Sequence, residues 1–132
     1  MKKIAFLFLI YDKINNEELW NIFFNNIDIN KYNIYIHYKY KYNTKLKYFD
    51  NYKLNNNLCI ETKYADISII KAQNVLLKEA LKDQNNAHFI FLSGACIPFQ
   101  RFDYIYNFLN SNKSYFNLSA LDQIIPRAKN AL

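Results

Sequence analysis

The chain contains a single glycine, Gly94, which follows an unbroken apolar run at residues 89–92 almost directly. A short apolar run that stops at turn residues is typical of a strand covered on both faces. Gly94 is also the one position with an unrestricted backbone. A lone glycine excludes the glycine-rich phosphate loops of P-loop and dinucleotide-binding proteins. Because ligands of open α/β sheets bind beyond the carboxyl ends of the strands, residues 93–98 form either a binding site or a tight connection without a ligand.

The apolar pattern elsewhere alternates between the strand and helix periods. It predicts strands at residues 4–10, 33–38, 58–62 and 88–92, a further strand at 114–118, and helices at 17–25, 69–83 and 102–109. Strands that alternate with helices favour parallel pairing and right-handed crossovers. We therefore expect one α/β domain over residues 1–132, with a Rossmann-like, mainly parallel sheet flanked by helices and a poorly anchored tail at 119–132.

The net charge of +6 comes mainly from lysine, and much of it lies in residues 38–53. There the cations and aromatics alternate: Lys39, Lys41, Lys45, Lys47 and Lys53 with Tyr38, Tyr40, Tyr42, Tyr48 and Tyr52. Such a pattern could stack bases and hold phosphates. It is equally typical of a solvated sheet edge that lysines protect from pairing. Lys, Asn and Tyr are abundant throughout the chain, so nucleic-acid binding is the less favoured interpretation.

The two cysteines, Cys59 and Cys96, form neither a disulfide framework nor a metal-binding spacing. No Asp-x-Asp motif occurs, and the two histidines lie far apart, so we expect no bound metal. The apolar run at residues 4–10 resembles the core of a signal peptide, but the run is too short and no cleavage site follows it. A buried first strand is therefore the favoured interpretation. No segment approaches the ~20 apolar residues that span a bilayer. These features together predict a cytoplasmic protein.

Four segments resemble the core-2/I-branching β-1,6-N-acetylglucosaminyltransferase family, including its plant branch. They are K-I-A-F-L-F-L at residues 3–9, Y-N-I-Y-I-H at 32–37, I-S-I-I-K-A-Q-N-V-L-L-K-E-A-L at 67–81 and F-I-F-L-S-G-A-C-I-P-F at 89–99. Plant-type members have a similar aromatic-x-x-Ile-Ser opening of the long helix and a Leu-Ser-Glu-x-Cys-Ile-Pro turn. The order and spacing agree over about residues 3–118.

This resemblance implies the amino-terminal half of a GT-A-type domain. The family transfers a sugar, typically N-acetylglucosamine, from a UDP-sugar donor to a glycan or protein acceptor, with inversion and without metal or another cofactor. The resemblance places the donor at the ends of the first two strands and next to the two later segments: Ile10, Tyr11, Asp12, His37, Tyr38, Lys39, Tyr64, Ser93 and Gly94.

The chain departs from the family pattern at several of these positions. Gly94 stands in place of a glutamate, Tyr64 in place of a tryptophan, and Lys39 follows the histidine segment where animal members have an acidic residue. The family's catalytic glutamate and its diphosphate-neutralising cations belong to a second half that this chain does not reach. Inverting transfer needs both, so no catalytic residue is assigned.

Two interpretations therefore stay open. The first is part of a glycosyltransferase that self-associates or requires its missing carboxyl-terminal half, with an apolar patch exposed where that half would pack. The second is a catalytically inactive structural or interaction protein that reuses the fold.

Overall fold

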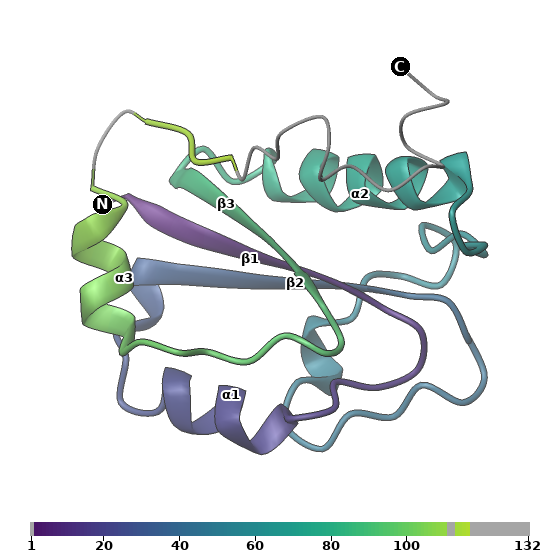
Figure 1. Cartoon of the computed structure of the whole chain (residues 1–132), viewed down its shortest axis with the longest axis horizontal. Helices are drawn as coiled ribbons and strands as arrows, with labels where there is room; N and C mark the ends of the chain where they lie inside the picture. Colours follow the sequence, from purple (N-terminus) through teal and green to yellow (C-terminus); the bar gives the residue numbers. More distant parts are fainter. Residues whose placement is uncertain (1, 111–112, 117–132) are drawn as a thin grey trace, which may run out of the picture.

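The computed structural model describes residues 2–110 and 113–116 (Figure 1). Its elements, in chain order, are β1 (Lys3–Ile10), α1 (Glu17–Phe24), β2 (Tyr32–Tyr38), α2 (Ile67–Ala80), β3 (Asn86–Ser93) and α3 (Phe102–Phe108), with short 3₁₀ helices at Ile29–Lys31 and Asp50–Tyr52. Residues 114–116 form no strand, and the rest of the strand expected at 114–118 lies outside the described residues, as does the tail at 119–132.

The described sheet is parallel throughout, with the strand order β2-β1-β3. Phe6 in the middle of β1 pairs with Ile34 of β2 and with Ile90 of β3. The expected α/β architecture is confirmed as a parallel sheet flanked by helices. The central strand is β1, which lies between β2 and β3.

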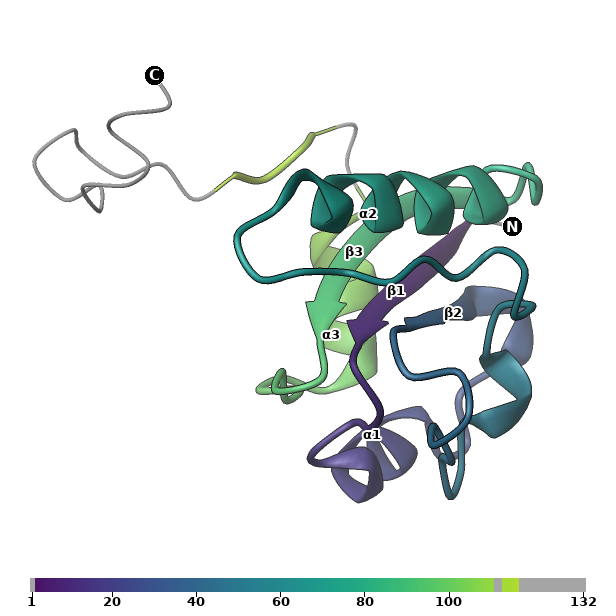
Figure 2. The same cartoon turned by 90° about the vertical axis from the view of Figure 1, so that its right-hand side faces the viewer.

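Helices cover both faces of the sheet (Figures 1 and 2): α2 lies on one face, and α1 and α3 lie on the other. Side chains of β1 alternate between these layers. Ile4, Phe6, Phe8 and Ile10 of β1 are buried in one layer with Trp20 and Phe24 of α1 and Phe102 of α3. Ala5 and Leu7 of β1 are buried in the other layer with Leu76 and Ala80 of α2. The two-sided burial of β1 explains its unbroken apolar sequence.

Aromatic rings dominate the layer between β1 and α1. The Phe6 ring lies edge-on to Phe24 with ring centroids 5.0 Å apart, and to Trp20 at 6.3 Å. Phe8 meets Trp20 in the same geometry at 5.1 Å. Edge-to-face pairs stabilise a fold by about 0.5–1.5 kcal/mol each beyond the area they bury. These contacts fix α1 to the central strand.

A polar network joins the amino ends of all three strands. The Asn33 amide of β2 donates to Asp83 and to Asn86, at 2.8 Å in each case. Asn86, which is buried, donates onward to the carbonyl of Ala80 at the end of α2 (2.7 Å), and Lys3 of β1 pairs with Asp83 at 3.4 Å. The network fixes strand register at the end of the sheet opposite the carboxyl ends.

The outer edge of β2 is occupied by the long connection that follows it. The Leu54 amide donates to the carbonyl of Ile36 at 2.8 Å, and the Ile60 amide donates to His37 Nε2 at 2.9 Å. The prediction of a strand at residues 58–62 is therefore wrong, because the Ile60 amide bonds to a side chain and residues 59–63 follow an irregular path. The same connection includes the lysine and tyrosine stretch. Its tyrosines do not form one exposed surface, since Tyr38 is buried and Tyr42 is 95% exposed.

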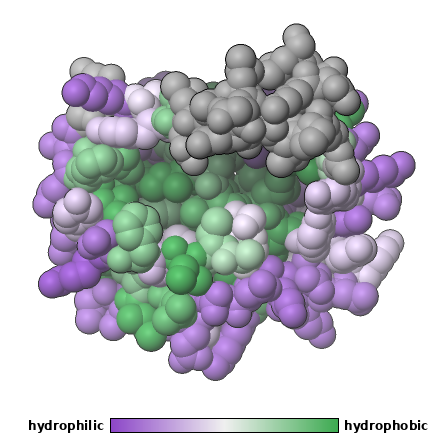
Figure 3. Space-filling view, viewed as in Figure 1, coloured by the Kyte–Doolittle hydropathy of each residue, from purple (hydrophilic) through white to green (hydrophobic). Residues whose placement is uncertain are grey.

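The outer edge of β3 is open in the described part of the chain, where β3 pairs only with β1. The prediction that this strand is covered on both faces is wrong, since Phe91 is 46% exposed. Exposed apolar side chains flank it on both helical layers, from Ile70 of α2 to Tyr104 and Phe108 of α3. Figure 3 shows an apolar, hollowed surface on this side of the molecule.

None of the described helices combines the length and the apolar character needed to cross a membrane. The longest of them, α2, has 14 residues and carries buried side chains along only one face.

The open β3 edge predicts that the purified chain binds a hydrophobic dye such as ANS and self-associates, because an uncovered apolar edge strand attracts other surfaces. Phe91→Lys should lower dye fluorescence and shift sedimentation toward the monomer, whereas Ile29→Lys, at an exposed residue on the 3₁₀ helix before β2, should not. A monomeric wild-type chain that binds no dye would contradict this account.

Candidate functional site

A pocket of about 410 Å³ opens at the carboxyl ends of β1 and β3. From β1 the chain passes through α1 to one neighbour, and α2 then returns it to the other side of β1, with the two helices on opposite faces. Ligands of open α/β sheets bind at such a switch point, and the volume is in the range of small-molecule sites. The pocket is lined by Leu9, Ile10, Tyr11, Asp12, Lys13, Asn15, Thr62, Ile69, Ser93, Gly94 and Ala95.

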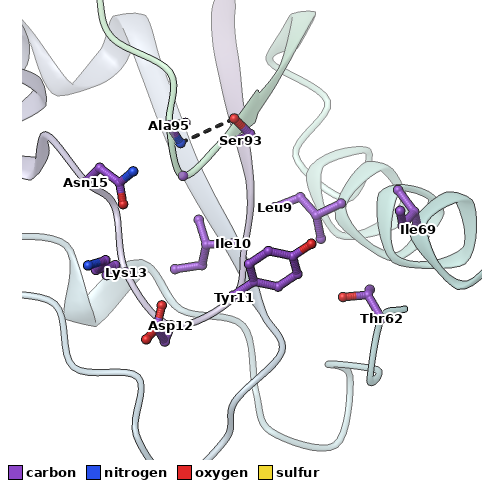
Figure 4. A pocket seen from close by; sticks show the side chains of 11 residues that line it. Leu9, Ile10, Tyr11, Asp12, Lys13, Asn15, Thr62, Ile69, Ser93 and Ala95 are labelled. Atoms are coloured by element: carbon purple, nitrogen blue, oxygen red, sulfur yellow. Dashed lines mark hydrogen bonds between the residues drawn. The ribbon is translucent and has the colours of Figure 1, made fainter. Parts of the chain in front are cut away.

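The loop after β1 forms one wall of the pocket and is held by backbone hydrogen bonds on two sides. On one side, Asn15 donates to the carbonyl of Gly94 at 2.8 Å. On the other, the amides of Lys39 and Tyr40 both donate to the carbonyl of Tyr11 at 3.0 Å. Figure 4 shows Tyr11 projecting into the pocket, with Thr62 and Ile69 across from it. All three strands thus contribute to the position of this loop.

Gly94 is required for close packing and not for an unusual backbone angle. Its φ is not positive, contrary to the role expected from its freedom of conformation. A Cβ at this position would lie 2.7 Å from the carbonyl oxygen of Lys13, closer than real Cβ atoms approach a backbone atom. The glycine therefore lets the loop after β1 and the turn after β3 meet at the base of the pocket.

The turn after β3 is built from its own side chains. Ser93 Oγ accepts the Ala95 amide at 3.3 Å, the bond drawn in Figure 4, and lies 3.4 Å from Cys96 Sγ. Trp20 Nε1 donates to the carbonyl of Cys96 at 3.0 Å and so anchors the turn to α1. The Ser93 side chain therefore shapes the pocket wall as well as facing the cavity.

His37 is fully buried and lies behind the pocket wall. Its Nε2 accepts the Ile60 amide, so the neutral ring carries its proton on Nδ1, which has no hydrogen-bond partner among the described residues. Burial lowers the pKa of His37 to about 4. The ring therefore holds the irregular segment of residues 59–63 against β2, and that segment supplies Thr62 to the pocket.

The structure brings together some of the residues expected to bind the donor and separates others. Ile10, Tyr11, Asp12, Ser93 and Gly94 line the pocket. The remainder do not: His37 and Tyr38 are buried, Lys39 contacts the Tyr11 ring from outside, and Tyr64 is 81% exposed.

Ala95 lies in the stretch of residues 93–98 that was expected as a candidate site, whereas five lining residues were not expected from the sequence: Leu9, Lys13, Asn15, Thr62 and Ile69. Proximity to the ends of β1 and β3 could have identified most of them. Thr62 and Ile69 could not be found in this way, because the path of residues 59–66 depends on the hydrogen bond to His37.

Two lysines give this end of the sheet a positive character. Lys13 lines the pocket, and the ammonium group of Lys39 lies 5.4 Å from the Tyr11 ring centroid and 5.1 Å from that of Tyr40. Within residues 2–110 and 113–116 neither lysine makes an ion pair, and no three residues of the metal-ligating types cluster. The site can therefore attract an anionic group through lysine.

A parallel sheet with helices on both faces defines an α/β domain of the Rossmann-like class. The chain belongs to the Core-2/I-Branching enzyme family, whose model matches residues 4–126. It is 29% identical over 119 residues to Glycosyltransferase BC10 of Oryza sativa subsp. japonica, an alignment that covers 86% of this chain and 29% of that protein. The chain thus spans less than a third of the length of this curated relative. No solved structure gives a significant match.

Gly94→Ala should displace the loop after β1, because the added Cβ would overlap the Lys13 carbonyl. We expect a loss of stability of about 1–3 kcal/mol, as for other overpacked sites, measured by urea unfolding. Ala95→Ser, one residue further along the turn, serves as the control. Equal stability of Gly94→Ala and the wild type would show that the loop does not pack as described.

The stability of the chain should fall as the pH drops from about 6.5 to about 4. In this window the unfolded His37 binds a proton that the folded, buried ring does not, so acid favours unfolding. The difference amounts to about 3 kcal/mol at pH 4. Urea unfolding of His37→Gln should show a shallower pH dependence than the wild type and than His88→Gln, whose ring is only partly buried. Identical pH profiles for wild type and His37→Gln would contradict the assignment.

Proposed function

We propose that these residues form the donor-binding part of a glycosyltransferase that takes a UDP-sugar. The observation that carries the proposal is the pocket at the carboxyl ends of β1 and β3, which is lined by parts of the segments that resemble the donor site of the family. The family match and the name of the plant relative support the same activity.

The finer features of this activity follow from the lysines and from the family resemblance. We propose N-acetylglucosamine as the transferred sugar and a reaction that needs no metal ion. A departing diphosphate requires positive charge, and Lys13 of the pocket lining can supply part of it where other transferases use a metal ion. A glycan or protein hydroxyl would be the acceptor.

Inverting transfer requires a general base in addition to donor binding. The acceptor oxygen forms a bond to the anomeric carbon as the bond to the diphosphate breaks; UDP leaves with that electron pair, and a base accepts the hydroxyl proton. Asp12 is the acidic residue of the pocket lining. Since the chain spans less than a third of its plant relative, we propose that the base and further cations come from outside these residues.

An inactive interaction protein is the second candidate, although the open apolar edge of β3 is expected for either protein. Such a protein would use the edge to bind a partner and would not need the pocket.

Calorimetric titration separates these proposals. UDP-N-acetylglucosamine should bind in the millimolar range or tighter, with the same affinity in the presence of EDTA, and the chain alone should transfer no sugar to an acceptor. Absence of binding at millimolar donor would favour the inactive protein, and a loss of affinity with EDTA would contradict metal independence. If transfer is observed, substitutions Asp12→Asn, Glu61→Gln and Asp66→Asn would identify the base.

A further inference from the structure

We propose that His37 is a positioning residue of the pocket: by accepting the Ile60 amide it sets the wall to which Thr62 belongs, and it touches no ligand itself. This inference rests on the proposed function and adds to it a residue that controls donor affinity from behind the pocket. It differs from the direct donor contact that the family resemblance implies for His37, because the structure places this side chain outside the lining.

The His37 ring lies behind the surface of the pocket. His37 of β2 is paired with Leu9 of β1, and paired residues of parallel strands direct their side chains to the same face of the sheet. Leu9 lines the pocket, whereas the His37 side chain is fully buried. The wall therefore covers the ring and keeps it from a ligand.

Side chains hold the irregular connection into α2 at two points. Near its start, the Ile60 amide donates to His37 Nε2 at 2.9 Å. Near its end, the Lys63 amide donates at 2.9 Å to the hydroxyl of Ser68, in the first turn of α2. Thr62 lies between these two points. Because a short segment follows the position of both its anchors, loss of the bond to His37 should displace Thr62.

Thr62 is the part of this connection that reaches the pocket. Its side chain is only 3% exposed and yet lines the cavity. Figure 4 shows its hydroxyl on the side that faces Tyr11 across the pocket. Polar groups of a binding site must be held to within about 0.5 Å of their working positions. The anchor of Thr62 should therefore affect affinity without contacting the ligand.

Stability alone does not account for a histidine at this position. The buried Nδ1 carries the proton of the neutral ring and has no hydrogen-bond partner among the described residues. An unpaired buried N–H costs stability, and an apolar side chain of similar size would avoid that cost. Burial lowers the pKa of His37 to about 4, and the charge of Lys41 acts in the same direction, so Nε2 stays an acceptor at neutral pH. That acceptor is what the histidine supplies.

The test is NMR titration of the full chain with UDP at pH 7. His37→Leu should weaken UDP binding by about tenfold, the equivalent of one lost hydrogen bond. His37→Gln should restore the affinity to within about twofold of the wild type, because the glutamine side-chain oxygen can accept the Ile60 amide. A direct contact between the ring and the donor would be lost in both variants.

Two further measurements show whether His37 acts through the wall. Thr62→Val should also weaken UDP binding, and adding His37→Leu to it should weaken binding little further, because both changes disturb the same contact. Coupling between two sites is reciprocal. UDP should therefore slow hydrogen exchange of the Ile60 amide in the wild type and in His37→Gln, but not in His37→Leu.

A matched control separates positioning from a general loss of stability. Ile36→Val changes the preceding residue of β2, whose side chain is buried in the opposite layer. It should lower stability in urea unfolding and leave UDP affinity unchanged. If His37→Leu does not fold, His37→Asn, whose side chain is too short to reach the Ile60 amide, replaces it.

The outcomes distinguish the positioning role from the proposed function. If UDP binds the wild type and His37→Leu equally, or if His37→Gln or Ile36→Val loses as much affinity as His37→Leu, the positioning role is overturned while donor binding stands. If the wild type does not bind UDP, the proposed function fails, and the positioning role fails with it.

Discussion

The burial of β1 is the constraint on which the rest of the structure depends. This strand pairs with a neighbour on each side and faces a helical layer on each face, so its side chains contact nearly every other element. Phe6 and Phe8 connect β1 to α1, and Phe6 also connects it to α3. Burying each large apolar side chain stabilises the fold by about 1.5–3 kcal/mol, and a one-residue slip of β1 would move each of its side chains to the opposite layer.

The two ends of this buried strand have different tasks. At the amino ends, the network around Asn33, Asp83 and Asn86 fixes the strands relative to one another. At the carboxyl ends, the loops after β1 and β3 pack closely at Gly94 and are joined by the hydrogen bond from the Asn15 amide to the Gly94 carbonyl. A rigid sheet with loops at one end is the arrangement that positions binding residues in α/β proteins. The proposed donor site uses this arrangement.

Local patterns in the sequence were sufficient to predict the parallel α/β class, the bounds of β1 and β2 to within one residue, and the presence of α2, whose bounds differ by two or three residues from those expected. Sequence reasoning failed where one element depends on another far along the chain. Residues 58–62 have the composition of a strand, but the His37 ring takes the Ile60 amide and Leu54 occupies the edge of β2. The apolar run at residues 89–92 suggested a strand covered on both faces, yet Phe91 is exposed and the outer edge of the strand is open in the described part of the chain.

The central claim is that a nucleotide binds at the carboxyl ends of β1 and β3, and amide chemical-shift mapping of the isotope-labelled chain with UDP tests it most directly. The account predicts that the amides of residues 10–15 and 93–96 shift on titration, while those of Asn33 and Asn86 at the opposite end of the sheet do not. Shifts confined to the open edge of β3, or to residues 41–53 of the lysine and tyrosine stretch, would contradict it.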